Sequence, residues 1–134
     1  MSHGPVAGNG IPITLAPGKV VFWSALVQAT NTQFVQIKDS AGAVVFTAAG
    51  ASPDGHSPAQ IGAGFFQPAD PTGAYTVWLG TNGGASWSSV VWSQDVLDDG
   101  GPPLLTKYVF GSEDGGDADY NDTYLQLQWF DSVG

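Results

Sequence analysis

The sequence predicts an all-β protein, namely an antiparallel β-sandwich of about nine strands with Greek-key or jelly-roll-like connections. Three observations indicate this fold class. Nine prolines and nineteen glycines divide the 134-residue chain into short segments. Runs rich in valine and aromatic residues lie between these turn formers, and several of them alternate apolar and polar side chains. No stretch shows sustained helical periodicity.

The first half of the chain contains a series of short predicted strands, which are expected to pair as hairpins. They span residues 11–15, 19–28, 33–39, 43–48 and 60–66. Pro17-Gly18 and Ala41-Gly42 mark turns between them. The segment 49–56 is rich in Gly, Pro, Ser and Asp, which is typical of a loop.

In the second half, alternation is clearest in residues 74–79 and 86–94. The linking residues 81–84 read TNGG, and Asn-Gly strongly favours a hairpin turn, so we expect these two strands to pair. Residues 104–110 run into an acidic segment and residues 123–130 run out of it. The acidic segment is therefore predicted to be a strand-to-strand turn.

We expect residues 1–134 to form a single domain, with residues 1–10 (MSHGPVAGNG) as a flexible N-terminal tail. A chain of this length can bury a core without disulfides, and it contains no cysteine. Most tryptophans and phenylalanines are expected to fill that core between the sheets. His3 and His56 fall in the predicted tail and loop, where no metal or catalytic role is expected for them.

The formal net charge of −9, with three lysines and no arginine, argues against DNA, RNA or an anionic membrane surface as a partner. No run of eighteen apolar residues exists to insert into a bilayer, so a soluble protein is expected. Residues 1–10 lack the basic and apolar regions of a signal peptide. The expected location is therefore cytoplasmic, extracellular by a non-classical route, or both.

The most informative segment is residues 113–122, which read EDGGDADYND and hold five carboxylates and one amide. Two unit charges about 4 Å apart repel by roughly 4 kcal/mol at a surface-like dielectric, so this turn calls for a counter-ion. All the donors are hard oxygens, which calcium prefers.

An EF-hand is the first calcium loop to test, because Asp117, Asp119 and Asn121 match its first three side-chain ligand positions. The match fails at the sixth position, where Asp122 replaces the required glycine, and at the twelfth, where Gln128 replaces glutamate.

A turn at Gly115-Gly116 would instead bring the oxygen donors of both arms together, and these donors exceed what one calcium ion takes. Two adjacent ions with open positions would bind neighbouring hydroxyls of a polyol. A single structural calcium and a solvated acidic turn remain as alternatives.

Residues 111–122 (GSEDGGDADYND), the alternating strand that reaches Trp129 and the final glycine together resemble the LecB-like two-calcium bacterial lectins, which bind fucose and mannose. The similarity continues more weakly through Thr14-Leu15, the segment 28–33 and the turn at Asn82-Gly83. It covers most of residues 11–134.

The resemblance implies a ligand set for two calcium ions. One ion would be shared by Glu113, Asp117, Asp119 and Asp122, and the other would be held by Asp119, Asn121 and Asp122. Gln28 stands where the family usually shows asparagine, and its backbone carbonyl can supply the same oxygen.

The resemblance also implies that Ala29, Thr30 and Asn31 tune sugar preference, and that Asp114 hydrogen-bonds the sugar. Alanine at the first position is similar to mannose-preferring members, which favours mannose over fucose.

In the family the terminal carboxylate reaches a calcium ion of a partner subunit, which implies a homodimer or homotetramer. This chain ends two residues later than expected after its last motif aspartate, so Gly134 or Asp131 would fill that role.

Two other function classes compete with a lectin. A structural calcium-binding module of a bacterial surface protein would use the same acidic turn without binding sugar. A glycoside hydrolase needs an acid and a base on either side of the scissile bond, which clustered metal ligands supply poorly, so we expect no enzyme.

Overall fold

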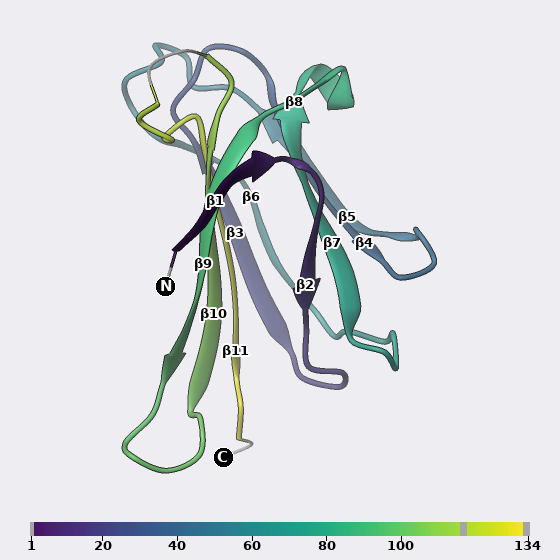
Figure 1. Ribbon diagram of the computed structural model, residues 1–134. Helices are drawn as coiled ribbons and strands as arrows, with labels where there is room; N and C mark the ends of the chain where they lie inside the picture. Colours follow the sequence, from purple (N-terminus) through teal and green to yellow (C-terminus); the bar gives the residue numbers. More distant parts are fainter. Residues whose placement is uncertain (1, 116–117, 133–134) are drawn as a thin grey trace.

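The computed structural model describes residues 2–115 and 118–132, and these residues form antiparallel strands joined by short loops (Figure 1). The strands are β1 (Ser2–Ala7), β2 (Asn9–Thr14), β3 (Val21–Val27), β4 (Gln33–Asp39), β5 (Val44–Gly50), β6 (Ala59–Phe66), β7 (Ala74–Thr81), β8 (Ser86–Trp87), β9 (Ser89–Leu97), β10 (Leu105–Glu113) and β11 (Thr123–Phe130). A 3-10 turn, η1 (Asn82–Gly84), lies between β7 and β8.

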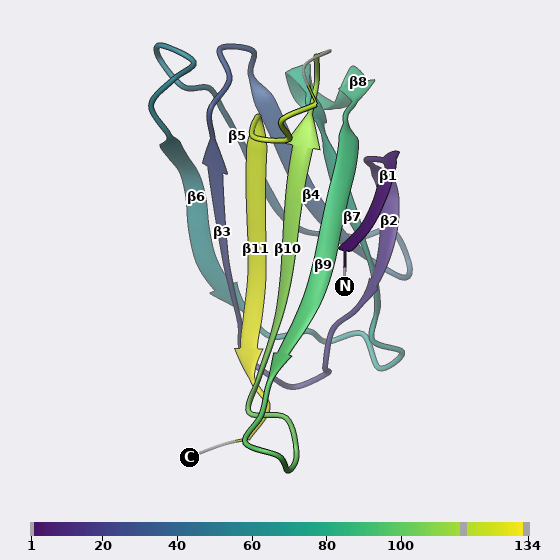
Figure 2. The same ribbon diagram turned by 60° about the vertical axis from the view of Figure 1, so that its left-hand side comes forward.

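The strands are divided between two sheets that face each other (Figure 2). One sheet has the order β1-β9-β10-β11-β3-β6, and the other has the order β2-β7-β4-β5 with β8 added beside β7. The predicted antiparallel β-sandwich is therefore confirmed. The described residues form eleven strands where about nine were expected, because the N-terminal segment and the short β8 also pair.

The predicted flexible tail over residues 1–10 is wrong for the part of it that the structure describes. β1 pairs with β9 from Ser2 opposite Ser93 to Ala7 opposite Ser89, and His3 stacks on Trp92 with ring centroids 4.3 Å apart. All six β1 side chains are exposed, so side-chain patterning carries no strand signal here. The backbone hydrogen bonds that β1 gives to the edge of β9 hold the segment instead.

The predicted hairpin between residues 74–79 and 86–94 is right about the turn and wrong about the pairing. β7 and β8 pair only at Gly80 opposite Trp87 and at Thr81 opposite Ser86. The chain then crosses to the other sheet, where β9 lies between β1 and β10. Alternation indicates which side chains face the core, but it does not identify the neighbouring strand.

The core lies between the sheets and contains apolar side chains from both of them. Its fully buried members include Leu15, Val21, Val35, Ile37, Val77, Leu79, Val90, Phe110, Leu125 and Leu127. Trp23 stacks on Phe46 with centroids 3.9 Å apart, so part of the aromatic content does fill the core. Phe65 and Phe130 are each 72% exposed, which departs from the expectation that most aromatic residues are buried.

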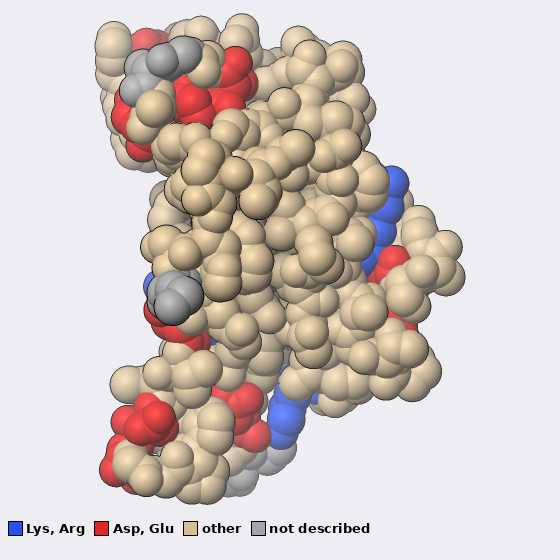
Figure 3. All heavy atoms as spheres, viewed as in Figure 1, with Lys and Arg blue, Asp and Glu red and all other residues tan. Residues whose placement is uncertain are grey.

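The β10–β11 hairpin determines where the acidic segment lies. The two strands pair from Leu105 opposite Phe130 to Ser112 opposite Thr123, so residues 113–122 connect them at one end of the sandwich. The loops that follow β3 and β5 reach the same end (Figure 1). Acidic atoms gather there on the surface, and no lysine atoms are visible at that end in this view (Figure 3). No helix among the described residues is long and apolar enough to cross a membrane.

Candidate metal and sugar site

Hydrogen bonds to its own backbone hold the acidic loop in place. The Asp122 amide donates to the Ser112 carbonyl at 3.0 Å, which closes the loop at the end of the hairpin. The Glu113 carboxylate accepts from the Gly115 amide at 3.1 Å and from the Tyr120 amide at 3.2 Å. The chain's only glutamate therefore organises both arms of the loop.

Tyr120 attaches the acidic loop to the sheet and has an unfavourable backbone conformation. Ala118 and Tyr120 have φ values of 57° and 53°, and non-glycine residues rarely adopt this left-handed backbone. The Tyr120 hydroxyl hydrogen-bonds the Ser89 hydroxyl at 3.0 Å. A Cβ at Gly111 would come within 2.8 Å of the Tyr120 carbonyl oxygen. Glycine at position 111 therefore lets the loop fold back onto β10.

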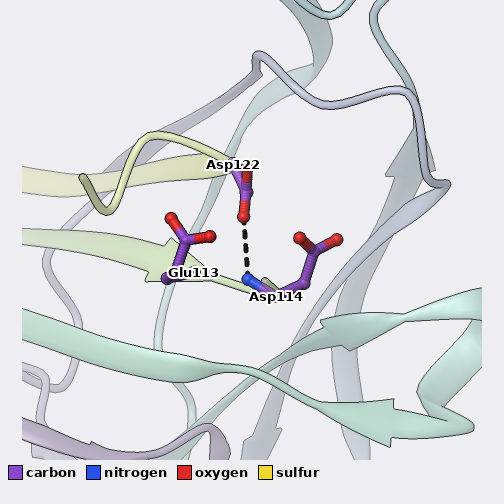
Figure 4. Close-up of side chains that lie close together, drawn as sticks. All are labelled: Glu113, Asp114 and Asp122. Carbon is purple, nitrogen blue, oxygen red and sulfur yellow. Dashed lines mark hydrogen bonds between the residues drawn. The ribbon is translucent and has the colours of Figure 1, made fainter. Parts of the chain in front are cut away.

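Three carboxylates converge inside this loop. One ligand oxygen from each of Glu113, Asp114 and Asp122 lies within 4.8 Å of the others, and the Asp114 amide donates to Asp122 Oδ2 at 2.7 Å (Figure 4). Glu113 is only 6% exposed and Asp122 only 9%. Such like charges repel strongly where water is largely excluded.

The carboxyl pKa values reflect this crowding. Burial raises the pKa of Asp122 from 3.8 to about 6, and the neighbouring Asp114 carboxylate adds to the rise, although a bond from the Asp114 amide opposes it. Burial also acts to raise the pKa of Asp114, but hydrogen bonds from Asp122, Gln33 and Asn31 outweigh it and lower that pKa. A bound cation would relieve the same repulsion that a proton on Asp122 relieves.

Gln33 connects this cluster to the core. Its side chain is fully buried and donates to Asp114 Oδ2 at 2.9 Å and to the Asn31 carbonyl at 3.2 Å, while its oxygen accepts from the Thr123 hydroxyl at 2.9 Å. The Asn31 amide also donates to Asp114 Oδ2, at 3.4 Å. One buried amide thus fixes a carboxylate of the acidic loop and the loop that follows β3.

The acidic loop forms one wall of a cavity of about 520 Å³. Apart from Asp131, all the predicted site residues that the structure describes line this cavity, namely Gln28, Ala29, Thr30, Asn31, Glu113, Asp114, Asp119, Asn121 and Asp122. Gly55, His56 and Gly115 complete the lining. The two segments, 28–31 and 113–122, are more than eighty residues apart in sequence and are brought together because β3 pairs with β11.

Gln28 connects the acidic loop to the loop between β5 and β6. Its backbone amide donates to the Asp122 carbonyl at 3.1 Å, and its side-chain amide donates to the His56 carbonyl. The side chain is thus directed to the loop that carries His56.

Two predicted ligands, Asp117 and Gly134, lie outside the described residues. Asp131, the alternative to Gly134, is at the opposite end of the hairpin from the acidic loop. Its carboxylate accepts from the Thr106 hydroxyl at 2.7 Å and from the Trp129 indole at 3.0 Å.

Sequence reasoning missed Gln33, Gly55 and His56. The inward-facing alternation of Gln33, Val35 and Ile37 was a usable signal, because an amide in a core position needs a polar partner. No local signal placed His56 in the lining of this cavity, because the cavity forms where distant loops meet.

The donor chemistry of this site fits calcium. The carboxylates are hard oxygen ligands, they carry more negative charge than the surrounding residues neutralise, and they border an open cavity. Glu113, Asp114, Asp119 and Asp122 line it together with the amide of Asn121.

The role of Gln33 is testable with the variant Gln33→Leu. Loss of the amide leaves the buried Thr123 hydroxyl without its partner, so we expect the free energy of unfolding to fall by about 1–3 kcal/mol in urea titrations. Gln36→Leu is the matched control on the same strand, because Gln36 bonds Thr47 on the exposed face. Its expected change is within about 0.5 kcal/mol. Equal effects of the two variants would contradict the role.

The Asp122 pKa predicts a pH dependence of stability in the chelator-treated protein. The folded pKa of about 6 exceeds the ordinary value of 3.8, so the folded state binds the proton more tightly than the unfolded state between these values. We therefore expect the melting temperature to rise as pH falls from about 6 to about 4. Asp122→Asn should remove this rise.

Asp54 and Asp70 do not interfere in this window. Hydrogen bonds from Ser57 and His56 lower the pKa of Asp54, and bonds from Ser40 and Thr72 lower that of Asp70. Their contributions to stability are lost only as pH falls below the ordinary aspartate pKa. A wild-type melting temperature that drops steadily between pH 6 and pH 4 would count against the assignment to Asp122.

The chain is similar to a known protein family and to several solved structures. Residues 13–131 match the family described as Fucose-binding lectin II (PA-IIL). No curated protein sequence matches the chain significantly.

Several solved structures are similar to this one over nearly the whole chain. The high-affinity mannose-binding lectin of Ralstonia solanacearum superposes with a TM-score of 0.75 at 28% identity, over 92% of this chain and 96% of that one. The Chromobacterium violaceum lectin CV2L, solved with α-methyl-fucoside, gives 0.73 at 28% identity with the same coverage. The C-terminal domain of the Burkholderia cenocepacia BC2L-C lectin gives 0.72 at 25% identity, over 96% of this chain and 100% of that domain. The predicted resemblance is thus confirmed, and this chain belongs to the PA-IIL family of carbohydrate-binding lectins.

Proposed function

We propose that this lectin binds its sugar through two calcium ions and prefers mannose to fucose. The observation that carries the proposal is the shared cavity, in which the acidic loop and the segment 28–31 meet. The acidic loop supplies the anionic oxygens that calcium prefers, and the segment 28–31 supplies uncharged residues beside them.

The proposed ligands are those that the family resemblance implies. Glu113, Asp117, Asp119 and Asp122 would hold one ion, and Asp119, Asn121 and Asp122 would hold the other. The Gln28 carbonyl would add an oxygen to one of the two ions. When bound, calcium offers coordination positions at which vicinal sugar hydroxyls replace water. Asp114 accepts a hydrogen bond from the sugar, and Gln33 and Asn31 hold its carboxylate in place for that purpose.

The preference for mannose rests on Ala29, which is 9% exposed and lines the cavity. A serine there would present a hydroxyl that favours fucose, and alanine lacks it. The Ralstonia lectin, described as mannose-binding, and the Chromobacterium lectin, solved with a fucoside, support this choice of the two sugars.

We propose a homodimer or homotetramer in which the Gly134 carboxylate reaches a calcium ion of the partner. Gly134 is a better candidate than Asp131, because the Asp131 carboxylate already accepts hydrogen bonds from Thr106 and Trp129. Several sites on one assembly would raise the avidity for multivalent glycans beyond the modest affinity of one sugar. The proposed activity is binding alone, without breaking a bond.

Titration calorimetry with methyl mannoside and methyl fucoside tests the calcium dependence. We expect binding of both sugars with excess calcium, tighter for mannose, and no binding after chelation. Asp119→Ala should abolish calcium and sugar binding, because Asp119 serves both ions in the proposed ligand set.

Asp99→Ala is the matched control, since it removes the same charge from the loop at the opposite end of the sandwich. It should leave both affinities unchanged. Calcium binding without sugar binding would instead favour a structural calcium module, and full calcium-dependent binding by Asp119→Ala would contradict the two-ion arrangement.

Ala29→Ser tests the source of the sugar preference. The added hydroxyl should raise the affinity for methyl fucoside relative to methyl mannoside by about threefold to tenfold, as expected for one hydrogen bond. The ratio of the two dissociation constants, measured by calorimetry, reports the change. A ratio equal to that of the wild-type protein would show that Ala29 does not set the preference.

A further inference from the structure

The cavity has a second wall that the acidic loop does not supply. Gly55 and His56, in the loop between β5 and β6, line it together with Thr30. These residues carry no carboxylate, in contrast to the wall formed by the acidic loop. Pockets of roughly 300–1,000 Å³ hold molecules of drug size, which are larger than one hexose. At about 520 Å³ the cavity falls within this range.

The loop that carries His56 is fixed by its own hydrogen bonds. Asp54 Oδ1 accepts from the His56 amide at 2.9 Å and from the Ser57 amide at 2.8 Å. The Ser52 hydroxyl is buried, donates to the Ser57 carbonyl at 2.7 Å and accepts from the Gly55 amide at 3.2 Å. A wall held in this way is preorganised, so contact with a ligand requires little further ordering.

Further bonds attach this loop to the segment that follows β3. The Ser52 amide donates to the Ala29 carbonyl at 2.8 Å, and the Gln28 side chain donates to the His56 carbonyl. A Cβ at Gly55 would lie 3.1 Å from the Thr30 methyl group, so glycine keeps the gap between the two loops open. Gly55 and His56 are thus held beside the segment 28–31, which is proposed to determine the preference for the first sugar.

The His56 side chain can both hydrogen-bond a sugar and pack against its ring. It is exposed, and no hydrogen bond or ring contact to the imidazole is found among the described residues. A neutral imidazole offers one donor and one acceptor to sugar hydroxyls, and its flat ring can pack against the apolar face of a pyranose. The proposed calcium ligands are Gln28 and residues of the acidic loop, so the His56 imidazole is available to contact ligand.

We propose that His56, Gly55 and Thr30 form a subsite for a second sugar unit, linked to the hexose that the acidic loop binds. The ligand class is therefore a mannose-containing disaccharide or longer glycan. This inference rests on the proposed function, since the first unit must occupy the calcium site.

The test compares methyl α-mannoside with a set of methyl dimannosides of different linkage, by calorimetry with excess calcium. We expect at least one dimannoside to bind the wild-type protein about threefold to tenfold more tightly than the monosaccharide. His56→Ala should remove most of this advantage. The matched control is His3→Ala, which removes the only other histidine, on β1, and should retain the advantage.

Nuclear magnetic resonance of the two histidine rings provides a second measurement on the unaltered protein. The His56 signals, assigned by their persistence in His3→Ala, should shift more with the tighter dimannoside than with methyl α-mannoside. Equal shifts with both ligands would contradict the subsite even if His56→Ala failed to fold.

The outcomes separate this inference from the proposed function. If methyl α-mannoside binds but no dimannoside binds more tightly, the subsite is wrong and the calcium site stands. If His56→Ala weakens both ligands by the same factor, His56 contacts the first sugar and the subsite is also wrong. If neither ligand binds the wild-type protein with calcium, the proposed function itself fails.

Discussion

Repulsion between carboxylates at one end of the sandwich is the constraint on which the site depends. Glu113, Asp114 and Asp122 are close enough for their charges to interact strongly, and two of them are nearly buried. An apo protein tolerates this only by protonating one group or by satisfying the others with hydrogen bonds. Both responses are open to this loop, because the raised pKa of Asp122 makes its protonation easier and amide groups hydrogen-bond Glu113 and Asp114.

The sandwich supplies the rigidity that keeps this charge in place. β10 and β11 are central strands of the larger sheet, paired on both sides, so the ends that carry Glu113 and Asp122 cannot move apart easily. Gln33 extends this support from β4 in the other sheet, because its buried amide bonds both Thr123 and Asp114. The acidic loop is therefore held by both layers of the fold, which is what a preorganised binding site needs.

Three loops at this end of the sandwich line the cavity, and each contributes a different kind of residue. The acidic loop contributes carboxylates, the segment after β3 contributes Ala29, Thr30 and Asn31, and the loop after β5 contributes Gly55 and His56. Hydrogen bonds from Gln28 and Ser52 link the last two loops. A substitution in one of these two loops is thus expected to alter the position of the other.

The sequence by itself determined the fold class, the β10–β11 hairpin and the acidic turn. Alternating side chains indicate strands directly, and a dense group of hard oxygen donors within ten residues indicates a cation site regardless of its surroundings. Only the tertiary structure decided that β9 pairs with β1 and β10, that residues 2–7 form a strand, that Gln33 bonds Asp114 and that His56 lines the cavity. These features depend on contacts between segments far apart in the chain. Local patterns report which way a side chain faces, but not which distant residue it meets.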